Sequence, residues 1–227
     1  MRLKVIGTGS SGNCYAVYAS GKILLLDAGL PYRIILRGID FQIQDVAGCI
    51  ITHSHGDHAK AIKDLESAGV PCWKAWEDPP VASKLFGPFR VMASFEVPHD
   101  GTDNRGFILE AGGQRLLYVT DFEYCPVTFR RWKLNHLLVE CNYTPDMLDE
   151  GEHKYAHVLR GHASLQTVKD FVAANRTSSL RTVTICHMSA GSDIDRMVSE
   201  IKQVAGPVAK VFAAIPELEI RMDKVPF

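Results

Sequence analysis

The stretch Thr52-His53-Ser54-His55-Gly56-Asp57-His58 directly follows the apolar run Val46-Ala47-Gly48-Cys49-Ile50-Ile51, which predicts a buried strand. Three imidazoles and one carboxylate therefore stand close together at a strand end, and both groups are good ligands for zinc-like ions. The first two imidazoles can converge on one ion. The glycine permits a sharp reversal, so that the aspartate and the third imidazole can face a second ion. A polar loop with chance histidines is the alternative, and the H-x-H-x-D-H spacing argues against it.

Length and composition indicate an ordinary globular protein. The chain has 227 residues, of which 46% are hydrophobic and 22% charged. No linker, low-complexity tract or internal repeat divides it, so we expect a single domain over residues 1–227. The first residues read as a strand rather than a signal peptide, and no apolar run has the length of a membrane span. We therefore expect a cytoplasmic protein with no membrane partner.

Charge and cysteine content restrict the function less strongly. The formal net charge is −1, so the chain has no overall basic excess that would indicate nucleic-acid binding. Bound divalent ions would nevertheless be the largest local charges in a cleft, and the net charge does not count them. The six cysteines are widely spread without a C-x-x-C pair, and we expect them to be reduced and structural.

Strand and helix signals alternate along the chain. Strands are expected over residues 3–7, 14–19, 22–27, 46–52, 72–75, 89–92, 95–97, 106–110, 115–120, 136–141, 181–186 and 208–213. Helices are expected over residues 31–37, 58–68, 145–159, 164–174 and 193–204, with Ser164 as an N-cap. This pattern favours a layered α/β architecture with sheets inside and helices outside.

Three further candidate ligands share one structural context. His99 follows the strand that ends at residue 97, Asp121 follows the strand that ends at residue 120, and His187 follows the strand that ends at residue 186. A lone histidine at a strand end is more often a hydrogen-bonded structural residue than a ligand. Loops at strand ends converge, however, and three such residues beside the H-x-H-x-D-H cluster predict one shared site.

The order H-x-H-x-D-H, His, Asp, His resembles the metallo-β-lactamase superfamily. The resemblance implies a four-layer αββα fold, with two mixed sheets packed face to face and helices outside. It also implies two divalent ions, zinc or manganese, with a bridging hydroxide as the nucleophile. One ion would be held by His53, His55, His99 and Asp121, and the other by Asp57, His58, His187 and again Asp121, whose carboxylate would bridge the pair.

A second motif, Arg160-Gly161-His162-Ala163-Ser164, addresses the substrate. It is similar to the nuclease branch of the superfamily, the ribonucleases of the J type and their β-CASP relatives. The resemblance implies that His162 contacts the scissile phosphate and assists the leaving oxygen, and that Ser164, with the amides that open its helix, contacts a phosphate. The alternative for His162 is a helix-entry residue that bonds to backbone.

Within that branch the chain most resembles a compact bacterial exonuclease group. The shared segments are Gly9-Ser10-Ser11-Gly12-Asn13-Cys14, His99-Asp100 and Val139-Glu140-Cys141-Asn142. The segment between the Asp121 and His162 motifs is too short for the capping domain that β-CASP enzymes insert there. Ala163 and Met188 also stand where the compact group has leucines.

Several other residues carry weaker signals. Ser10, Ser11 and Asn13 could bind substrate at the cleft floor, or simply form a tight turn between two strands. A strip of cations could track phosphates, although scattered surface charge is the more usual arrangement; it comprises Arg130, Arg131, Lys133, Lys154 and Arg160. Trp73, Trp76 and Trp132 could stack bases, with core packing as the safer expectation, and His153 and His157 are expected to face solvent or substrate.

The sequence thus predicts a dinuclear metal-dependent hydrolase of phosphodiester bonds. DNA is favoured over RNA as the nucleic acid substrate, an exonuclease is favoured, and Asp57 and His162 are the candidates for proton transfer. One alternative is a hydrolase of small esters, thioesters, lactones or cyclic phosphodiesters on the same fold, against which the G-H-A-S motif argues. The other is a non-catalytic, metal-stabilised regulatory protein, against which the complete ligand set argues.

Overall fold

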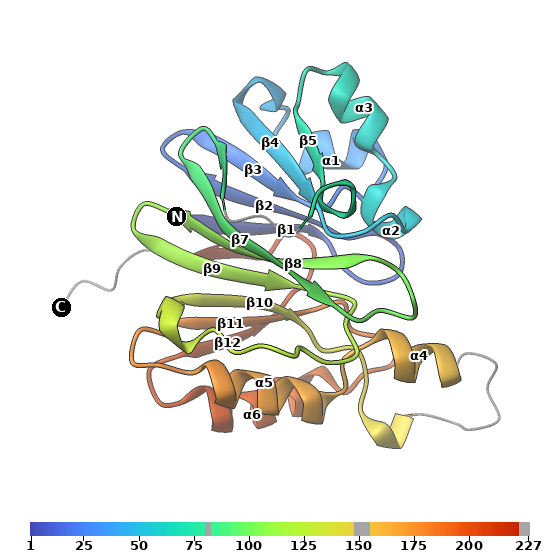
Figure 1. Ribbon diagram of the computed structural model, residues 1–227, viewed down its shortest axis with the longest axis vertical. Coiled ribbons are helices and arrows are strands. Elements are labelled where there is room, and N and C mark those ends of the chain that lie inside the picture. Colours follow the sequence, from blue (N-terminus) through green and yellow to red (C-terminus); the bar gives the residue numbers. More distant parts are fainter. Residues whose placement is uncertain (80–82, 148–154, 223–227) are drawn as a thin grey trace.

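Two β-sheets lie face to face, and helices cover the outer face of each, so that the molecule has four layers (Figure 1). The computed structural model describes residues 1–79, 83–147 and 155–222. This is the layered α/β arrangement that the alternating strand and helix signals predict, and the predicted fold class is confirmed.

The first sheet has the strand order β13-β1-β2-β3-β4-β5. Its strands are β1 (Arg2–Gly7), β2 (Cys14–Ala19), β3 (Lys22–Leu26), β4 (Val46–Ile51), β5 (Cys72–Lys74) and β13 (Glu219–Arg221). The β1–β2 and β2–β3 pairs are antiparallel, whereas β4 runs parallel to both of its neighbours. The strand that delivers the histidine cluster is therefore a buried interior strand.

The second sheet has the strand order β12-β11-β10-β9-β8-β7-β6. Its strands are β6 (Lys84–Phe86), β7 (Phe89–Val97), β8 (Asn104–Ala111), β9 (Gln114–Val119), β10 (His136–Glu140), β11 (Thr182–Cys186) and β12 (Lys210–Ala213). Strands β9 to β12 are parallel, so they all begin at one edge of the molecule and end at the opposite edge. In Figure 1 they run from left to right.

The helices complete the outer layers. They are α1 (Tyr32–Gly38), α2 (Gly56–Ala59), α3 (Ile62–Ser67), α4 (Tyr155–Gly161), α5 (Leu165–Asn175) and α6 (Ile194–Ala205). Helices α1 and α3 lie against the first sheet, and α5 and α6 cover the second (Figure 1). In the described part of the chain, no helix combines the length and apolar character needed to cross a membrane.

Alternation of side chains along the strands divides the interior into three layers. In β9, Leu116 and Tyr118 pack between the two sheets, while Leu117 and Val119 pack against α5 and α6. Successive side chains of a strand point to opposite faces, so a strand with both faces covered is apolar throughout. This accounts for the continuous apolar runs that precede each candidate ligand.

Two element predictions need correction. The helix expected over residues 58–68 is two helices, α2 and α3, because the Ala61 amide donates to the Ala28 carbonyl (2.9 Å) instead of continuing the turn. The strands expected over 89–92 and 95–97 are the single strand β7, which has a bulge between Val91 and Ala93. The short strands β6 and β13 were not predicted, since three residues carry too little periodicity.

The helix expected over residues 145–159 is confirmed in part, and the N-cap expected at Ser164 is confirmed in full. Of the helix expected over 145–159, the structure has a 3₁₀ turn at Pro145–Met147 and helix α4, with the residues between them outside the described ranges. Ser164 caps α5 as predicted, because its hydroxyl oxygen accepts a hydrogen bond from the Thr167 amide (3.1 Å).

Candidate metal centre

The predicted ligands meet at the edge where the parallel strands end. His53, His55, Asp57 and His58 follow β4 and begin α2. The other candidates follow β7, β9 and β11, and they are His99, Asp121 and His187. The structure thus brings together residues that are far apart in the sequence, because the loops at the carboxyl ends of parallel strands converge.

The backbone is unusual at three of these strand ends. Asp27, which follows β3, has φ of 58°, Asp121 has φ of 53°, and His187 has φ of 50°. Left-handed backbone is uncommon for residues other than glycine, and it persists where surrounding contacts enforce it. Here it turns each side chain abruptly out of the strand and into the shared site.

The predicted ligands form two groups, and a third group that could hold an ion combines Asp121 and His187 with Glu140 and His162. In the first group are His53, His55 and His99, and in the second are Asp57, His58, Asp121 and His187; within each group the ligating atoms lie within 4.8 Å of one another. Asp121 Oδ2 lies 3.4 Å from His58 Nε2, and also 3.9 Å from His53 Nε2 and 3.8 Å from His99 Nε2. One carboxylate oxygen is therefore within reach of both groups.

Two buried ring nitrogens indicate that these groups suit metal ions. His53 Nε2 and His187 Nε2 are both buried, and neither has a hydrogen-bond partner among the described residues. Buried polar atoms are normally satisfied, so orphaned ones at the centre of a histidine and carboxylate cluster point to a ligand that they would bind. Imidazoles with carboxylates fit divalent zinc or manganese.

Asp27 orients His58 from behind. This fully buried carboxylate accepts hydrogen bonds from His58 Nδ1 (2.7 Å), the Thr52 amide (2.7 Å) and Tyr118 Oη (2.5 Å). Because Nδ1 is occupied, His58 presents Nε2 to Asp121 and Asp57. Sequence reasoning gave Asp27 no role, although its position directly after the apolar strand Lys22–Leu26 is the same signal that singled out Asp121.

Glu140 does the same for two histidines. It is fully buried, and its Oε1 accepts from His162 Nδ1 (2.6 Å) and His187 Nδ1 (2.9 Å). Its Oε2 accepts from the Phe122 amide (3.0 Å) and the Ala163 amide (3.2 Å). Sequence reasoning named Glu140 only within a shared segment, so its role in joining the His162 motif to the ligand set was missed.

These contacts fix the charges of the site. Burial disfavours the charged form of His187, but Asp121 and the other nearby carboxylates outweigh burial and raise its pKa to about 10. Burial and the neighbouring His58 lower the pKa of His53 to about 2. Burial opposes ionisation of Asp121, yet the surrounding imidazoles, His187 first, hold its pKa well below the usual range. Without metal, protons supply the positive charge that the carboxylates attract.

The G-H-A-S motif lies beside the ligands. His99 Nδ1 donates to the Gly161 carbonyl (2.6 Å), which places α4 against the first ligand group. The His162 ring stacks on the His187 ring, with centroids 5.2 Å apart. Burial disfavours the His162 cation, but Glu140 outweighs it and raises the pKa of His162. The Ser164 hydroxyl, by contrast, is occupied with capping α5.

The Gly- and Ser-rich loop behaves as two parts. Ser10 and Ser11 are exposed in a turn, whereas Asn13 is fully buried. Asn13 Nδ2 donates to His58 Nε2 (3.0 Å) and the Asn13 amide donates to the Asp57 carbonyl (2.7 Å). Gly29 is required beside it, since a Cβ there would lie 1.6 Å from the Asp57 carbonyl oxygen. Asn13 therefore contacts the site directly.

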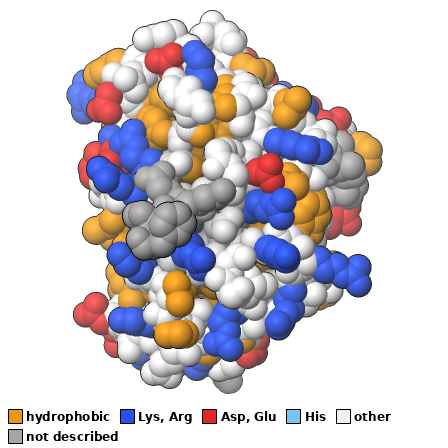
Figure 2. Space-filling view, turned by 90° about the vertical axis from the view of Figure 1, so that its left-hand side faces the viewer, with side chains coloured by type: hydrophobic (Ala, Val, Ile, Leu, Met, Phe, Trp, Pro, Cys, Tyr) orange, Lys and Arg blue, Asp and Glu red, His pale blue; other side chains and the backbone are white. Residues whose placement is uncertain are grey.

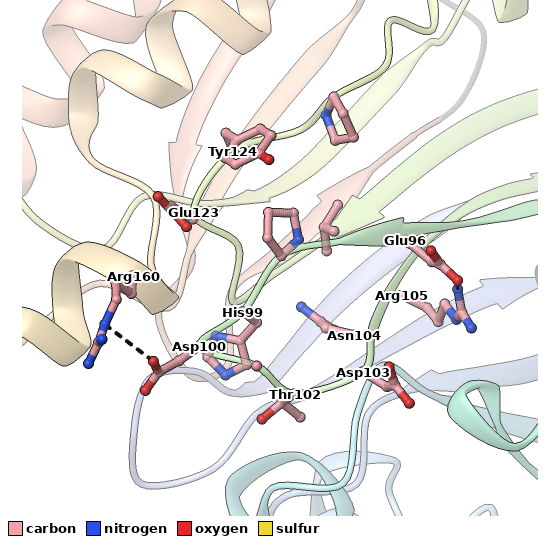
Figure 3. Close-up of a pocket in the computed structure, with 14 residues that line it drawn as sticks. Glu96, His99, Asp100, Thr102, Asp103, Asn104, Arg105, Glu123, Tyr124 and Arg160 are labelled. Carbon is pink, nitrogen blue, oxygen red and sulfur yellow. Dashed lines mark ion pairs between the residues drawn. The ribbon is translucent and has the colours of Figure 1, made fainter.

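A cavity of about 750 Å³ opens beside His99 (Figure 3). Two of its four carboxylates are paired, Glu96 with Arg105 and Asp100 with Arg160, the latter at 3.5 Å. Tyr124 borders the cavity with 53% of its surface exposed and also lines a neighbouring cavity of about 350 Å³ along α5. A groove thus leads away from the ligands past an exposed aromatic ring.

The remaining candidates are scattered. Trp73 is 3% exposed and packs in the core between the sheets, as the safer expectation had it. Arg160 borders the cavity beside the ligands, whereas Arg130 lines a different cavity at the opposite ends of the strands. His153 and Lys154 lie outside the described residues, as does the side chain of His157.

Comparison with known proteins agrees with this geometry. Residues 7–75, which include the H-x-H-x-D-H segment, match the metallo-beta-lactamase superfamily. The structure of YhfI from Bacillus subtilis, described as a metallo-beta-lactamase fold protein, superposes with a TM-score of 0.75 at 17% identity, covering 96% of this chain and 98% of the other. The family match over residues 7–75 and the likeness of fold over nearly the whole chain both agree with the site geometry, and the resemblance inferred from sequence is confirmed.

Two of the similar proteins are nucleases by name. The chain is 24% identical over 240 residues to exodeoxyribonuclease YycJ of Bacillus anthracis, covering 91% of this chain and 90% of the relative. The structure of the short form of human tRNase Z superposes with a TM-score of 0.66 at 16% identity, covering 99% of this chain and all of the other. This second likeness is one of fold.

Proposed function

We propose that this protein is a metal-dependent phosphodiesterase that degrades DNA from an end. The observation that carries the proposal is the position of His162, which is joined through Glu140 to His187 of the second ligand group. A histidine held at the rim of a two-metal ligand set is suited to a phosphate rather than to a neutral ester. The near full-length relative named as an exodeoxyribonuclease supports the same substrate.

The proposed ligands are those that the two groups contain. His53, His55 and His99 would hold one ion, Asp57, His58 and His187 the other, and Asp121 both. When bound, the ions would neutralise phosphate charge, act as Lewis acids and lower the pKa of water to near neutrality. The two orphaned ring nitrogens, His53 Nε2 and His187 Nε2, favour this assignment.

His162 would act on the phosphate with a proton. Its Nδ1 donates to Glu140, so the ring would donate to the substrate through Nε2. The neighbouring Glu140 carboxylate outweighs burial and raises the pKa of His162, which favours the protonated ring. A cationic donor stabilises the extra negative charge that develops on the phosphate oxygens, and it can protonate the departing oxygen.

Asp57 would orient groups at the second ligand set. Its carboxylate is about a quarter exposed and lies 3.5 Å from His58 Nε2 and 3.6 Å from His187 Nε2. Burial alone would raise its pKa, but the nearby His187 and His58 imidazoles hold it far below the usual range. Asp57 therefore stays ionised at neutral pH, which suits a metal ligand, and it is the more open of the two carboxylates in this group.

The groove past Tyr124 would carry the single strand away from the ligands. Its arginines are paired with carboxylates, which limits the attraction of backbone phosphates there. An exposed aromatic ring instead offers a stacking surface for a base. We therefore place base contacts, rather than phosphate contacts, along this groove.

The proposal is tested with the purified chain and end-labelled single- and double-stranded DNA and RNA, each with zinc, with manganese and with chelator. A circular single strand serves as the control for attack from an end. We expect metal-dependent release of short products from linear DNA and an intact circle. Asp121→Ala and His162→Ala should lose this activity, whereas the exposed helix residue change Asp64→Asn should not.

Other outcomes would redirect the proposal. Cleavage of the circle would make the protein an endonuclease, and faster digestion of RNA would change the substrate. Full activity in the Asp121→Ala and His162→Ala proteins would overturn the mechanism. Hydrolysis of small esters or lactones without any attack on nucleic acid would favour the small-molecule alternative.

A further inference from the structure

A second cavity lies at the end of the molecule opposite the ligands. Strand β11 runs from Thr182 to Cys186, with Arg181 just before it and His187 just after it. Six residue steps at about 3.3 Å each separate these two ends by roughly 20 Å. The cavity has a volume of about 380 Å³ and lies where β11 and β12 begin and where α5 and α6 end.

The wall of this cavity is cationic and hydroxylated. Arg130 and Arg176 line it together with Thr177 and Ser178, and none of its described lining residues is acidic. Arg181 stands next to it, because its Nη1 donates to the Ser178 carbonyl (2.7 Å). The planar donor fork of arginine matches the oxygens of a phosphate, and hydroxyl groups add further donors.

Arg176 is held in place by the backbone around it. Its Nη1 donates to the Val204 carbonyl (3.0 Å), and its side chain crosses Gly206 so closely that a Cβ there would lie 3.2 Å from Arg176 Cδ. Gly206 has φ of 92°, a conformation that suits glycine. The Arg176 guanidinium is thus positioned at the cavity. Val204 accepts from only one of its nitrogens, so its other N–H groups can donate to a ligand.

The cavity also has an apolar floor. Leu180, Ala205 and Ala209 line it and are nearly fully buried in the core beneath α5 and α6. Val208 adds an exposed apolar edge, with 63% of its surface accessible. Cations beside an apolar floor suit a ligand that combines phosphate with a flat apolar ring, which is the chemistry of a nucleotide.

Cations continue around the cavity on the same face. Arg131, Lys133 and Lys210 are exposed there, the first two beside Arg130 and the last at the start of β12. Figure 2 views this end of the molecule, where Lys and Arg side chains are spread over the surface and are more numerous than Asp and Glu side chains. The formal net charge of −1 does not reveal this local arrangement of cations.

We propose that this cavity and its cationic surroundings form a second binding site for the backbone of a polynucleotide, remote from the metal ligands. The inference rests on the proposed function for the identity of the ligand, since a nucleic acid is the polyanion that the metal centre would process. A strand long enough to cover the roughly 20 Å between the two ends would engage both sites at once. The second site would hold the substrate while the metal centre shortens its end.

The test changes the cavity and leaves the metal centre alone. Binding of labelled single-stranded DNA of about 24 nucleotides is measured by fluorescence anisotropy in chelator, for the wild type and for Arg130→Gln/Arg176→Gln. We expect the double variant to bind about tenfold more weakly. The slope of log binding constant against log salt concentration should become about 1.4 less steep, that is about 0.7 per lost phosphate contact. Arg33→Gln/Lys63→Gln removes two exposed cations from α1 and α3 and should change neither quantity.

Three further arms sharpen the result. Metal-loaded double variant should lose kcat/KM on the long strand but hydrolyse bis(p-nitrophenyl) phosphate, which is too small to reach the cavity, at the wild-type rate. Arg176→Lys should retain part of the affinity, because it keeps the charge. Polyglutamate of matched charge should compete poorly with DNA.

The outcomes separate this inference from the proposed function. Unchanged DNA affinity and salt dependence in the double variant would overturn the second site, whatever the nuclease activity. Equal competition by polyglutamate would also overturn it, and would make an acidic protein segment the ligand. A wild type that digests no nucleic acid but loses DNA binding in the double variant would retain the site and reject the nuclease.

Discussion

Both ends of the parallel strands β9 to β12 collect polar side chains, yet the two ends are built differently. At the carboxyl ends, Asp121 and Glu140 are buried and each is held by several short contacts. At the amino ends, Arg130 and Arg176 are exposed and long. Metal ions require ligands held in a fixed geometry, whereas a flexible phosphate backbone can be met by exposed cations.

The difference also explains why net charge is a poor guide to this protein. Carboxylates lie among the candidate ligands, where bound ions would neutralise them, whereas arginines without a carboxylate line the cavity at the opposite end. The sum is close to zero although the two ends differ in the charged groups that line them.

The largest expected effect comes from removing the carboxylate that both ligand groups share. Asp121→Ala should lower hydrolysis of any phosphodiester by at least about 10³-fold, because both ions would lose a ligand. Metal content by atomic spectroscopy and hydrolysis rates check this, with Asp64→Asn as the acidic control. DNA binding by Asp121→Ala in chelator should persist, because the cavity lined by Arg130 and Arg176 is unchanged. Retention of two tightly bound ions in Asp121→Ala would contradict the shared role.

A smaller effect is expected behind the ligands. Asp27→Asn and Glu140→Gln keep the size of each buried side chain but remove its negative charge. Asp27 orients His58, and Glu140 orients His162 and His187. Outer partners of this kind are typically worth about 10- to 100-fold in metal affinity or activity. We expect Asp27→Asn to act mainly on metal affinity and Glu140→Gln to act also on the pH profile, through His162. Equal profiles for both variants would show that Glu140 is only structural.

The groove past Tyr124 should contribute less. Loss of one base–aromatic contact is worth about 1–3 kcal/mol, so Tyr124→Ala should raise KM for single-stranded DNA by about tenfold with kcat little changed. Tyr124→Phe keeps the ring and should behave as the wild type. Steady-state kinetics on DNA and on bis(p-nitrophenyl) phosphate distinguish a base contact of Tyr124 from a structural role. An equal loss on the small ester would mean that Tyr124 supports the fold of the site instead.

The smallest effect is on stability against pH in the metal-free protein. The carboxylates around His187 raise its folded pKa to about 10, above the unfolded value near 6.5. The stability that this proton contributes is fully present below about pH 6.5 and is lost as the pH rises through about 10. We expect Tm in chelator to fall by a few degrees between about pH 7 and pH 10.

Two comparisons check that assignment. Metal-loaded protein should show a smaller fall, because the ion takes the place of the proton, and His187→Gln in chelator should also show a smaller fall. Melting curves followed by circular dichroism are sufficient. An identical fall in all three samples would place the titration in another group.

Most candidate ligands at the carboxyl ends of the strands could be predicted from the sequence. The H-x-H-x-D-H segment, His99, Asp121 and His187 each follow an apolar run, and the structure places all of them at one edge. The same signal was present for Asp27 and Glu140, but a carboxylate after an apolar strand has no visible partner in the sequence. Their partners, His58 and His162, stand 31 and 22 residues away.

The sequence by itself determined the fold class and the set of candidate metal ligands, because both depend on local patterns: apolar strand runs, and coordinating residues directly after them. Only the tertiary structure decided which nitrogen each histidine presents, since Asp27, Glu140 and the Gly161 carbonyl arrive from other strands and helices. It also separated Arg130 from Arg160, placing them at opposite ends of the strands. Side-chain charge is written in the sequence, but the end at which it acts depends on strand direction and chain crossing.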